Sequence, residues 1–267
     1  PIPPHRSQDV AVPEGDSYTL AADRIRPVLV GRHIERVDGS SPDVRRRSQD
    51  MLGAGVTQVR TIGKHLLIDL DNALSIHIHL GMPGRVGLGA AVGERGALRL
   101  ALTTDAGTVW VSAAPTVQVD RTKVIDHQLQ RLGPDVLAQE FDWARYRIQA
   151  SRYPNSPTVS DFLLDQRVMA GVGNLYKCEV LFWEKLDPNR TMDTVDMEKR
   201  IALAERARRL MMPNAHRSRR SATGRRRGTD RVFQRTGEPC RRCRTAIVEA
   251  WIGDPPRITY WCPQCQT

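Results

Sequence analysis

Aliphatic residues alternate with polar ones from residue 66 to residue 80, and this pattern predicts two adjacent β-strands. The aliphatic positions are 66, 68 and 70, then 74, 76, 78 and 80, and Asp71-Asn72 between them favours a turn. His77 and His79 occupy alternate positions of the second segment. Because successive side chains of a strand point to opposite faces, both histidines are expected on the face opposite the aliphatic residues.

The rest of the chain divides into a helix at the start, further strands and a helical second half. Acidic residues and Ser17 after Pro13 favour a helix start, and Gly31 favours its end. A turn at Asp105-Ala106-Gly107 predicts a hairpin between 98–102 and 108–112, after a glycine-rich stretch from 81 to 96. Further along, the expected helices are 141–150, 159–169, 175–183 and 195–212.

The composition is that of a globular protein with a cationic bias. Its 267 residues carry 40 Lys+Arg against 30 Asp+Glu, a formal charge of +10, and 35 of the cations are arginine. No apolar run approaches the ~18 residues of a membrane span, and residues 1–12 contain no apolar segment typical of a secretory signal. The charge favours nucleic acid as a partner, although a GC-rich genome would also explain the arginine excess. Because the chain has only five lysines, each lysine is more strongly expected to have a specific role than it would be in a lysine-rich protein.

Four of the five cysteines form two Cys-x-x-Cys pairs near the C-terminus. Cys240 and Cys243 are separated by 18 residues from Cys262 and Cys265, which matches the spacing of four-cysteine zinc sites. Four thiolates complete a tetrahedral site with no open position, so one structural zinc ion is expected. Two disulfides are the alternative, which a reducing cytosol disfavours. Cys178, in a helical segment, is expected in the core.

A short hairpin is expected between the two cysteine pairs. Its strands would be 247–251 and 258–261, so Arg257 would lie beside the hairpin tip, where it suits a phosphate contact or is a plain surface residue. Residues 213–230, rich in Arg, Ser and Gly, are expected to form a cationic linker that contacts phosphates or is simply solvated.

Several short segments spread over residues 13–267 carry a family resemblance. In chain order they are Pro13-Glu-Gly-Asp16, Gly63-Lys-His-Leu-Leu67, His79-Leu-Gly-Met82, 129–137 (Leu-Gln-Arg-Leu-Gly-Pro-Asp-Val-Leu), Gly171-Val-Gly-Asn-Leu-Tyr176, Glu179-Val-Leu-Phe182 and Arg257-Ile-Thr-Tyr-Trp-Cys262. Only the cysteine pattern is specific by itself. Their joint order and spacing resemble the formamidopyrimidine-DNA glycosylase/endonuclease VIII (Fpg/Nei) family of base-excision repair enzymes.

The resemblance implies an α+β fold. Residues 13–125 would form a β-sandwich catalytic domain with flanking helices, 126–230 a helix–two-turns–helix DNA-binding domain with the basic linker, and 231–267 a zinc finger built on a β-hairpin. Residues 1–12 would be an N-terminal extension. Damaged double-stranded DNA, or single-stranded or bubble DNA, would lie in the cleft between the first two domains. A monomeric enzyme of the bacterial cytoplasm, associated with the nucleoid, would excise oxidised bases and cleave the abasic site.

The resemblance also implies the catalytic residues. Pro13 would attack C1′ of the damaged nucleotide, because an N-terminal α-amine, with a pKa of about 7.7–8.0, is unprotonated to a far greater extent near neutral pH than a lysine amine with a pKa of about 10.4. Glu14 would be the general acid and base, unless it only caps a helix. Lys64 would be a second acid near the base or the sugar phosphate. Arg257 would hold a phosphate and assist δ-elimination.

Four further residues would contact DNA. Asn174 would bind a phosphate near a helix N-terminus, or serve only as a turn residue. Arg131 matches a DNA-contacting arginine of the endonuclease VIII branch. His79 would contact a phosphate, and Met82 would fill the gap left by a flipped base. Met82 could instead belong to the core, as could one of His77 and His79.

Pro13 departs from the family pattern because twelve residues precede it in this sequence. Its nitrogen is then a tertiary amide with no lone pair for attack, and Pro1 is followed by Ile2 rather than by glutamate. Three explanations are open: a misassigned start, with translation beginning at a GTG codon for Val12; cleavage of the extension; or an impaired enzyme that still binds damaged DNA.

The resemblance leaves the branch and two other functions open. The segment Leu-Gly-Pro-Asp-Val-Leu137 and the Arg257-x-x-x-Trp-Cys262 ending favour the endonuclease VIII branch, which removes oxidised pyrimidines, whereas Met82 favours the other branch. A non-catalytic module that binds damaged DNA is the second candidate. A zinc-ribbon protein bound to RNA is the third.

Overall fold

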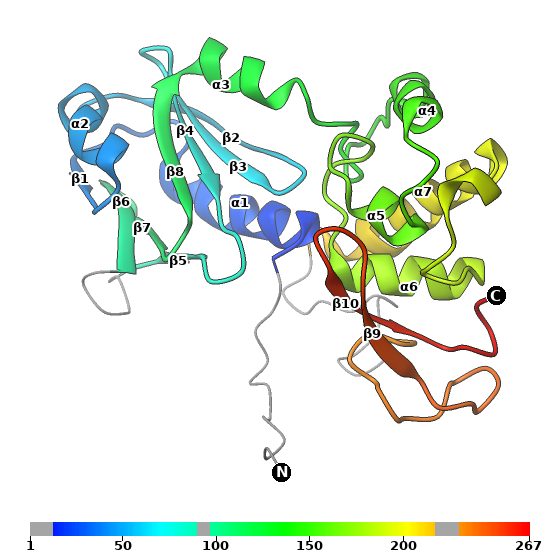
Figure 1. The fold of residues 1–267 in the computed structure, drawn as a ribbon. Helices are drawn as coiled ribbons and strands as arrows, with labels where there is room; N and C mark the ends of the chain where they lie inside the picture. Colours follow the sequence, from blue (N-terminus) through cyan, green and yellow to red (C-terminus); the bar gives the residue numbers. More distant parts are fainter. Residues whose placement is uncertain (1–12, 90–96, 217–229) are drawn as a thin grey trace.

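Two antiparallel sheets form the N-terminal part of the molecule (Figure 1). The computed structural model describes residues 13–89, 97–216 and 230–267. One sheet has the strand order β1-β6-β7-β5 and the other the order β2-β3-β4-β8. The strands are β1 (Arg36–Asp38), β2 (Val56–Ile62), β3 (His65–Leu70), β4 (Leu74–His79), β5 (Arg85–Leu88), β6 (Leu98–Thr104), β7 (Gly107–Ser112) and β8 (Thr116–Arg121).

One apolar core lies between these sheets. The aliphatic residues of β3 and β4 face it, together with those of β6 and β7 and one side of α1 (Gly15–Leu29). Leu66 pairs with Ile78 and Leu67 with His77 in the antiparallel register. The alternation seen in the sequence is therefore confirmed, and His77 and His79 lie on the face away from this core.

Five elements of this part were not predicted individually from the sequence: β1, β2, β5, β8 and α2 (Pro42–Met51). β1 is three residues long, and α2 buries only Val44 and Met51, so neither segment carries a strong periodic pattern. Both depend on contacts with the sandwich. The hairpin between β6 and β7 is confirmed.

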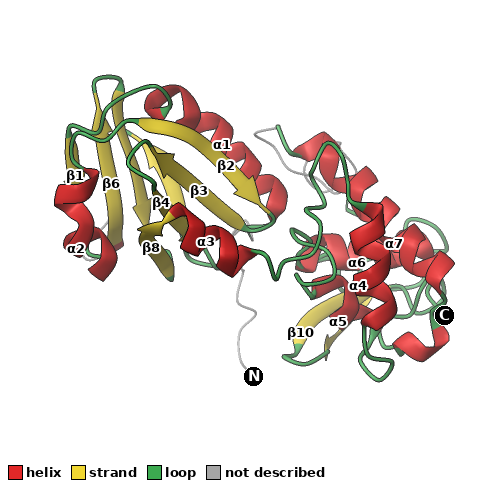
Figure 2. Cartoon of the chain, turned by 90° about the horizontal axis from the view of Figure 1, so that it is seen from above, coloured by secondary structure: helices red, strands yellow, loops and turns green. Residues whose placement is uncertain are grey.

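The second half is helical and has its own core. Its helices are α3 (Thr122–Leu129), α4 (Trp143–Arg152), α5 (Val159–Leu164), α6 (Asn174–Glu184) and α7 (Met197–Met211). Figure 2 shows α3 beside the sandwich, leading into the helical half. A small cluster that includes Leu67, Ile125, Leu129 and Ala170 joins the two halves.

The helix expected over 159–169 is shorter than predicted, because it ends at Leu164. The Asp165 carboxylate accepts the Arg167 N–H at 2.9 Å, which turns the chain. The Gln166 amide donates to the Val172 carbonyl and its oxygen accepts the Gly171 N–H. These local bonds replace the last helical turns and shape the segment before α6.

The C-terminal hairpin consists of β9 (Val248–Ile252) and β10 (Arg257–Trp261), as expected. It packs beside α6 (Figure 1), where Cys178 and Phe182 share a small core with Tyr260. The expected placement of Cys178 in a core is confirmed. Most of the cationic linker, residues 217–229, lies outside the described residues. None of the described helices is long and apolar enough to cross a membrane.

Candidate active site and metal centre

The start of α1 meets the start of α6 through the carboxylate of Glu14. This fully buried carboxylate accepts the backbone N–H groups of Gly173 at 3.0 Å and Leu175 at 2.8 Å. The Gly15 N–H donates to the Gly171 carbonyl at 3.0 Å. Since helix N-termini carry partial positive charge, a carboxylate between two of them is stabilised. The expected cap position of Glu14 at α1 is confirmed, and it also joins the two halves of the molecule.

Gly173 leaves room for this carboxylate. A Cβ atom at this position would lie 2.4 Å from Cδ of Glu14, far below van der Waals contact. Steric conflict with Glu14, 159 positions away in the chain, therefore explains why the second glycine position of the Gly-Val-Gly-Asn segment has no side chain.

Pro13 is half-buried and borders a cavity of about 500 Å³. Asp16 and Ser17 of α1, Arg85 of β5 and Trp110 of β7 are among its lining residues. A volume of this size is within the range of small-molecule sites. Pro13 thus borders an open cavity, whereas the carboxylate of the next residue, Glu14, is buried between the starts of α1 and α6.

Lys64 occupies the turn between β2 and β3, and this turn is attached to the helical half. The Asp135 carboxylate accepts the Gly63 N–H at 2.9 Å, and burial raises the pKa of Asp135. Gly63 has a φ of +55°, and a Cβ there would lie 2.7 Å from Cβ of Ala170. Lys64 is thereby held next to the 170–175 segment that binds Glu14.

His79 lies beside Lys64 on the polar face of β4. Its Nδ1 atom is 2.8 Å from the Lys64 carbonyl oxygen. Met82, in the turn after β4, is 56% exposed, so the alternative that it belongs to the core is wrong. Arg131 is exposed and lies near enough to His65 to act on it electrostatically.

His65 and His77 form a hydrogen-bonded pair beside His79. Nδ1 of His65 is 2.8 Å from Nε2 of His77, and the rings of His65 and His79 have centroids 5.1 Å apart. Burial, then the neighbouring histidines, Arg131 and Lys64, lower the pKa of His65 to about 3. Burial also lowers the pKa of His77, which is 7% exposed, so the core alternative holds for His77 rather than for His79.

Asn174 and Arg257 both lie in the region where the zinc-finger hairpin contacts α6. Asn174 is the first residue of α6, and its amide donates to the Ile258 carbonyl at 2.8 Å. Arg257, next to Ile258, is exposed at the start of β10. The Asp254 N–H donates to the Asp161 carboxylate of α5 at 2.9 Å. The hairpin is therefore attached to the helical half on both sides of Arg257.

Sequence patterns did not identify two side chains of the site, Lys177 and Asp135. Lys177 is fully buried on α6 and donates to Oγ1 of Thr259 at 2.6 Å, and burial lowers its pKa. The scarcity of lysine was a signal that could have identified it. Asp135 lay within the Leu-Gly-Pro-Asp segment, but only the fold brings it to Gly63.

Glu179, on α6, has a structural role: it binds the backbone of the segment before the zinc-finger hairpin. Its buried carboxylate accepts the N–H groups of Arg231, Val232 and Phe233 at 2.9 to 3.1 Å. Burial raises the pKa of Glu179 to about 7. This glutamate orders the segment that leads into the zinc-finger hairpin.

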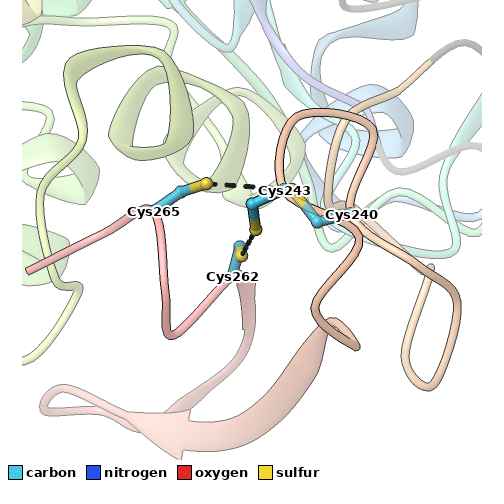
Figure 3. Close-up of side chains that lie close together, drawn as sticks. All are labelled: Cys240, Cys243, Cys262 and Cys265. Carbon is cyan, nitrogen blue, oxygen red and sulfur yellow. Dashed lines mark hydrogen bonds between the residues drawn. The ribbon is translucent and has the colours of Figure 1, made fainter.

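The four C-terminal cysteines form a site that fits one metal ion. The sulfur atoms of Cys240, Cys243, Cys262 and Cys265 all lie within 4.8 Å of one another, with separations of 3.4 Å and 4.0 Å for two pairs (Figure 3). Tetrahedral zinc with bonds of ~2.3 Å requires sulfur atoms ~3.8 Å apart. All four cysteines are free thiols in this structure, so the disulfide alternative is not supported.

Comparisons with known proteins agree with this architecture. The formamidopyrimidine-DNA glycosylase N-terminal domain model matches residues 12–115, and the formamidopyrimidine-DNA glycosylase H2TH domain model matches residues 132–223. The fold resembles that of Lactococcus lactis Fpg in a complex with DNA containing an abasic site, with a TM-score of 0.81 at 21% identity, covering 96% of this chain and 100% of that one.

Two relatives are similar along almost their whole length. The DNA-(apurinic or apyrimidinic site) lyase Nei2 of Mycolicibacterium smegmatis is 36% identical over 259 residues, which is 96% of this chain and 99% of that protein. The probable endonuclease 8 2 of Streptomyces coelicolor is 34% identical, over 96% of this chain and 94% of that protein. This similarity, the two matching domains and the shared fold show that the chain belongs to the formamidopyrimidine-DNA glycosylase/endonuclease VIII family.

Proposed function

We propose that this chain is a DNA glycosylase and abasic-site lyase that removes oxidised bases, with oxidised pyrimidines favoured. The observation that carries the proposal is the buried Glu14 carboxylate beside Pro13, between the starts of α1 and α6. The relatives named endonuclease 8 and abasic-site lyase support the same reaction class.

In the proposed reaction the Pro13 nitrogen attacks C1′, and the base leaves with the electron pair of its bond to C1′ and takes up a proton from solvent. The proton of the Pro13 amine passes to the Glu14 carboxylate. Glu14 donates a proton to the sugar ring oxygen, which opens the ring and leaves an iminium on C1′. The iminium accepts electrons while a C2′ proton is lost and the 3′ phosphate leaves. A second elimination, with loss of the C4′ proton, releases the 5′ phosphate, and water then hydrolyses the iminium and frees the Pro13 amine. Lys64 acts as a second acid near the base or the sugar phosphate.

Damaged double-stranded DNA is the proposed partner of a monomeric enzyme in the bacterial cytoplasm. Arg257 and Asn174 bind a phosphate at the start of α6, and Arg131 and His79 contact the strand beside Lys64. Met82, exposed after β4, fills the gap left by the flipped nucleotide. One structural zinc ion on the four cysteines keeps the hairpin that carries Arg257 folded.

The reaction needs Pro13 as an N-terminal residue, so a second candidate function concerns the chain as written. With residues 1–12 attached, the Pro13 nitrogen is an amide, and the protein would bind damaged DNA without forming the iminium.

Borohydride trapping on an oligonucleotide with one abasic site tests the proposal. The 13–267 form is expected to give a covalent adduct on the peptide that begins with Pro13, whereas the 1–267 form gives none. The 13–267 form with a chemically acetylated N-terminus is the matched control. If neither form is trapped but both bind the oligonucleotide, the binding function is correct and the enzymatic one is wrong.

A further inference from the structure

The hydroxyl of Tyr176 joins three elements that come from both halves of the molecule. Tyr176 belongs to the first turn of α6 and is fully buried. Its hydroxyl donates to Oδ2 of Asp16, in the first turn of α1, at 2.6 Å. The same oxygen accepts the side-chain amide of Asn214 at 2.9 Å, from the short 3₁₀ helix Met212–Asn214 that follows α7. A hydroxyl has one proton to donate and can accept at the same time, so this one group links all three elements.

Both partners of this hydroxyl are themselves held in place. Asp16 and Asn214 are each only 2% exposed. The second oxygen of Asp16 accepts the Ser17 N–H at 2.9 Å, which satisfies a backbone group of the first turn of α1. The Asn214 amide also donates to the Leu210 carbonyl of α7 at 3.0 Å. Because a buried hydrogen bond is stronger than the same bond in water, this network can fix the first turn of α1.

The bond from Tyr176 is a second anchor of α1 on α6, next to the one at Glu14. The Glu14 carboxylate accepts the N–H groups of Gly173 and Leu175, and Asp16 is bound two residues further along α1. The two anchors differ in chemistry. In the proposed reaction Glu14 takes up and releases a proton, and a neutral carboxyl group accepts hydrogen bonds more weakly than a carboxylate. The bond between Tyr176 and Asp16 contains no reacting group and keeps its strength throughout.

We propose that Tyr176 is a positioning residue for the reaction, which keeps Pro13 and Glu14 in place while Glu14 is protonated. Pro13 and Asp16 border the same cavity of about 500 Å³, so a shift of the first turn of α1 moves the nucleophile and the cavity wall together. Misplacement of reacting atoms by about 1 Å can slow a reaction about 100-fold. The role rests on the proposed function, because Glu14 changes its protonation only in that reaction.

Tyr176→Phe tests this role, because it removes the hydroxyl and keeps the ring. The first measurement is the single-turnover rate of borohydride trapping by the 13–267 form, at saturating concentrations of a duplex with one abasic site. The second is the dissociation constant for a duplex with a tetrahydrofuran analogue of that site. Tyr146→Phe is the matched control, since Tyr146 is equally buried in the same core and its hydroxyl donates to the Arg200 carbonyl. Both variants lose one buried hydrogen bond, but only Tyr176→Phe changes a contact with α1.

We expect Tyr176→Phe to be trapped at least about tenfold more slowly with an unchanged dissociation constant, and Tyr146→Phe to react at the wild-type rate. Asp16→Ala breaks the same bond from the side of α1 and should also slow trapping. The double variant should be no slower than the slower single variant, because the shared bond is lost only once.

The possible outcomes separate this role from the proposed function. A wild-type trapping rate for Tyr176→Phe, or equal slowing by Tyr146→Phe, overturns the positioning role and leaves the proposed function intact. Absence of trapping by the 13–267 form without substitutions overturns both. Should Tyr176→Phe fail to fold, Asp16→Ala decides: a wild-type rate contradicts the role, and slow trapping with unchanged affinity supports it.

Discussion

Two β-hairpins bring a cation to the segment before α6, and they are held there by different means. The β2–β3 hairpin carries Lys64 and belongs to a four-stranded sheet over a continuous apolar core. The β9–β10 hairpin carries Arg257 and is a two-stranded sheet with a small core. Burial of apolar side chains therefore mainly determines where the first hairpin lies, with one bond from Gly63 to Asp135 at its turn, whereas the second depends on several polar contacts and on the cysteine site.

This difference has a physical basis in the number of apolar side chains available. A segment of fewer than 40 residues buries too little surface to fold by itself, so specific bonds have to supply the missing free energy. Around Arg257 those bonds are the ones to Asp161, Asn174 and Lys177. Each contact of the zinc-finger hairpin is consequently expected to matter more than a comparable polar contact of the sandwich.

Removal of the proposed zinc ion should produce the largest difference in stability between the two hairpins. Chelation, or Cys262→Ser, removes a free energy of about 10–16 kcal/mol by analogy with isolated zinc fingers. We expect amide exchange to become fast in residues 231–267 and to stay slow in β3 and β4, as measured by hydrogen-exchange mass spectrometry. Unchanged protection of β10 after complete chelation would contradict a metal-dependent hairpin.

Truncation of the sandwich core should have the next largest effect. Leu66 is completely buried, so Leu66→Ala is expected to reduce the free energy of unfolding by about 2–5 kcal/mol. Urea unfolding measures this loss. Leu52→Ala is the matched control, because Leu52 is 48% exposed and its truncation should change stability by less than about 0.5 kcal/mol. Similar losses for both variants would mean that burial does not hold the Lys64 hairpin.

Alanine at Gly63 tests how that hairpin docks on the helical half. Gly63 and Gly53 both have positive φ, +55° and +79°, but only Gly63 lacks space for a Cβ. Gly53→Ala should cost about 1–2 kcal/mol of backbone strain. Gly63→Ala should cost more and also slow single-turnover base excision, because Lys64 is displaced. Equal stabilities and equal excision rates would show that the contact with Ala170 does not position Lys64.

A smaller effect is expected from removal of the Thr259 hydroxyl, which accepts a hydrogen bond from the buried Lys177 ammonium. Thr259→Val leaves that ammonium without this acceptor and should cost about 1–3 kcal/mol, with faster exchange in β10. Thr259→Ser keeps the hydroxyl and should restore most of the stability. If valine and serine behave alike, the bond to Lys177 contributes nothing to the hairpin.

Mild acid should weaken the sandwich by the smallest amount. The folded-state pKa of His65, about 3, lies below the ordinary value of 6.5, so the unfolded chain binds the proton more tightly. The neutral His65 ring therefore contributes its full stabilisation of the fold above pH 6.5, and this contribution is lost progressively as the pH falls from 6.5 through 3. At pH 5.5 the loss is about 1 kcal/mol. His65→Gln should remove this slope in urea unfolding between pH 7 and pH 5.5, and an unchanged slope would assign it to other groups.

Much of the fold follows from local patterns, and the exceptions have identifiable causes. The alternation around Ile76 and the capping residues before α1 were sufficient to predict those elements. α5 ended early because Gln166 bonds to residues beyond the helix, and β1 formed because β6 pairs with it. The pairing of β1 with β6 joins residues more than 60 positions apart, so this cause is not visible in a window of neighbouring residues.

The sequence by itself determined the chemistry that is available: the Pro13-Glu14 pair, a lysine and an arginine at two hairpins, and four cysteines with metal spacing. Only the tertiary structure decided that Glu14 is bound by the backbone of Gly173 and Leu175, and that Asp135 holds the turn of Lys64. The reason is physical. Periodicity and ligand spacing act between neighbours along the chain, whereas these contacts join residues 72 to 161 positions apart, which packing of the two cores alone brings together.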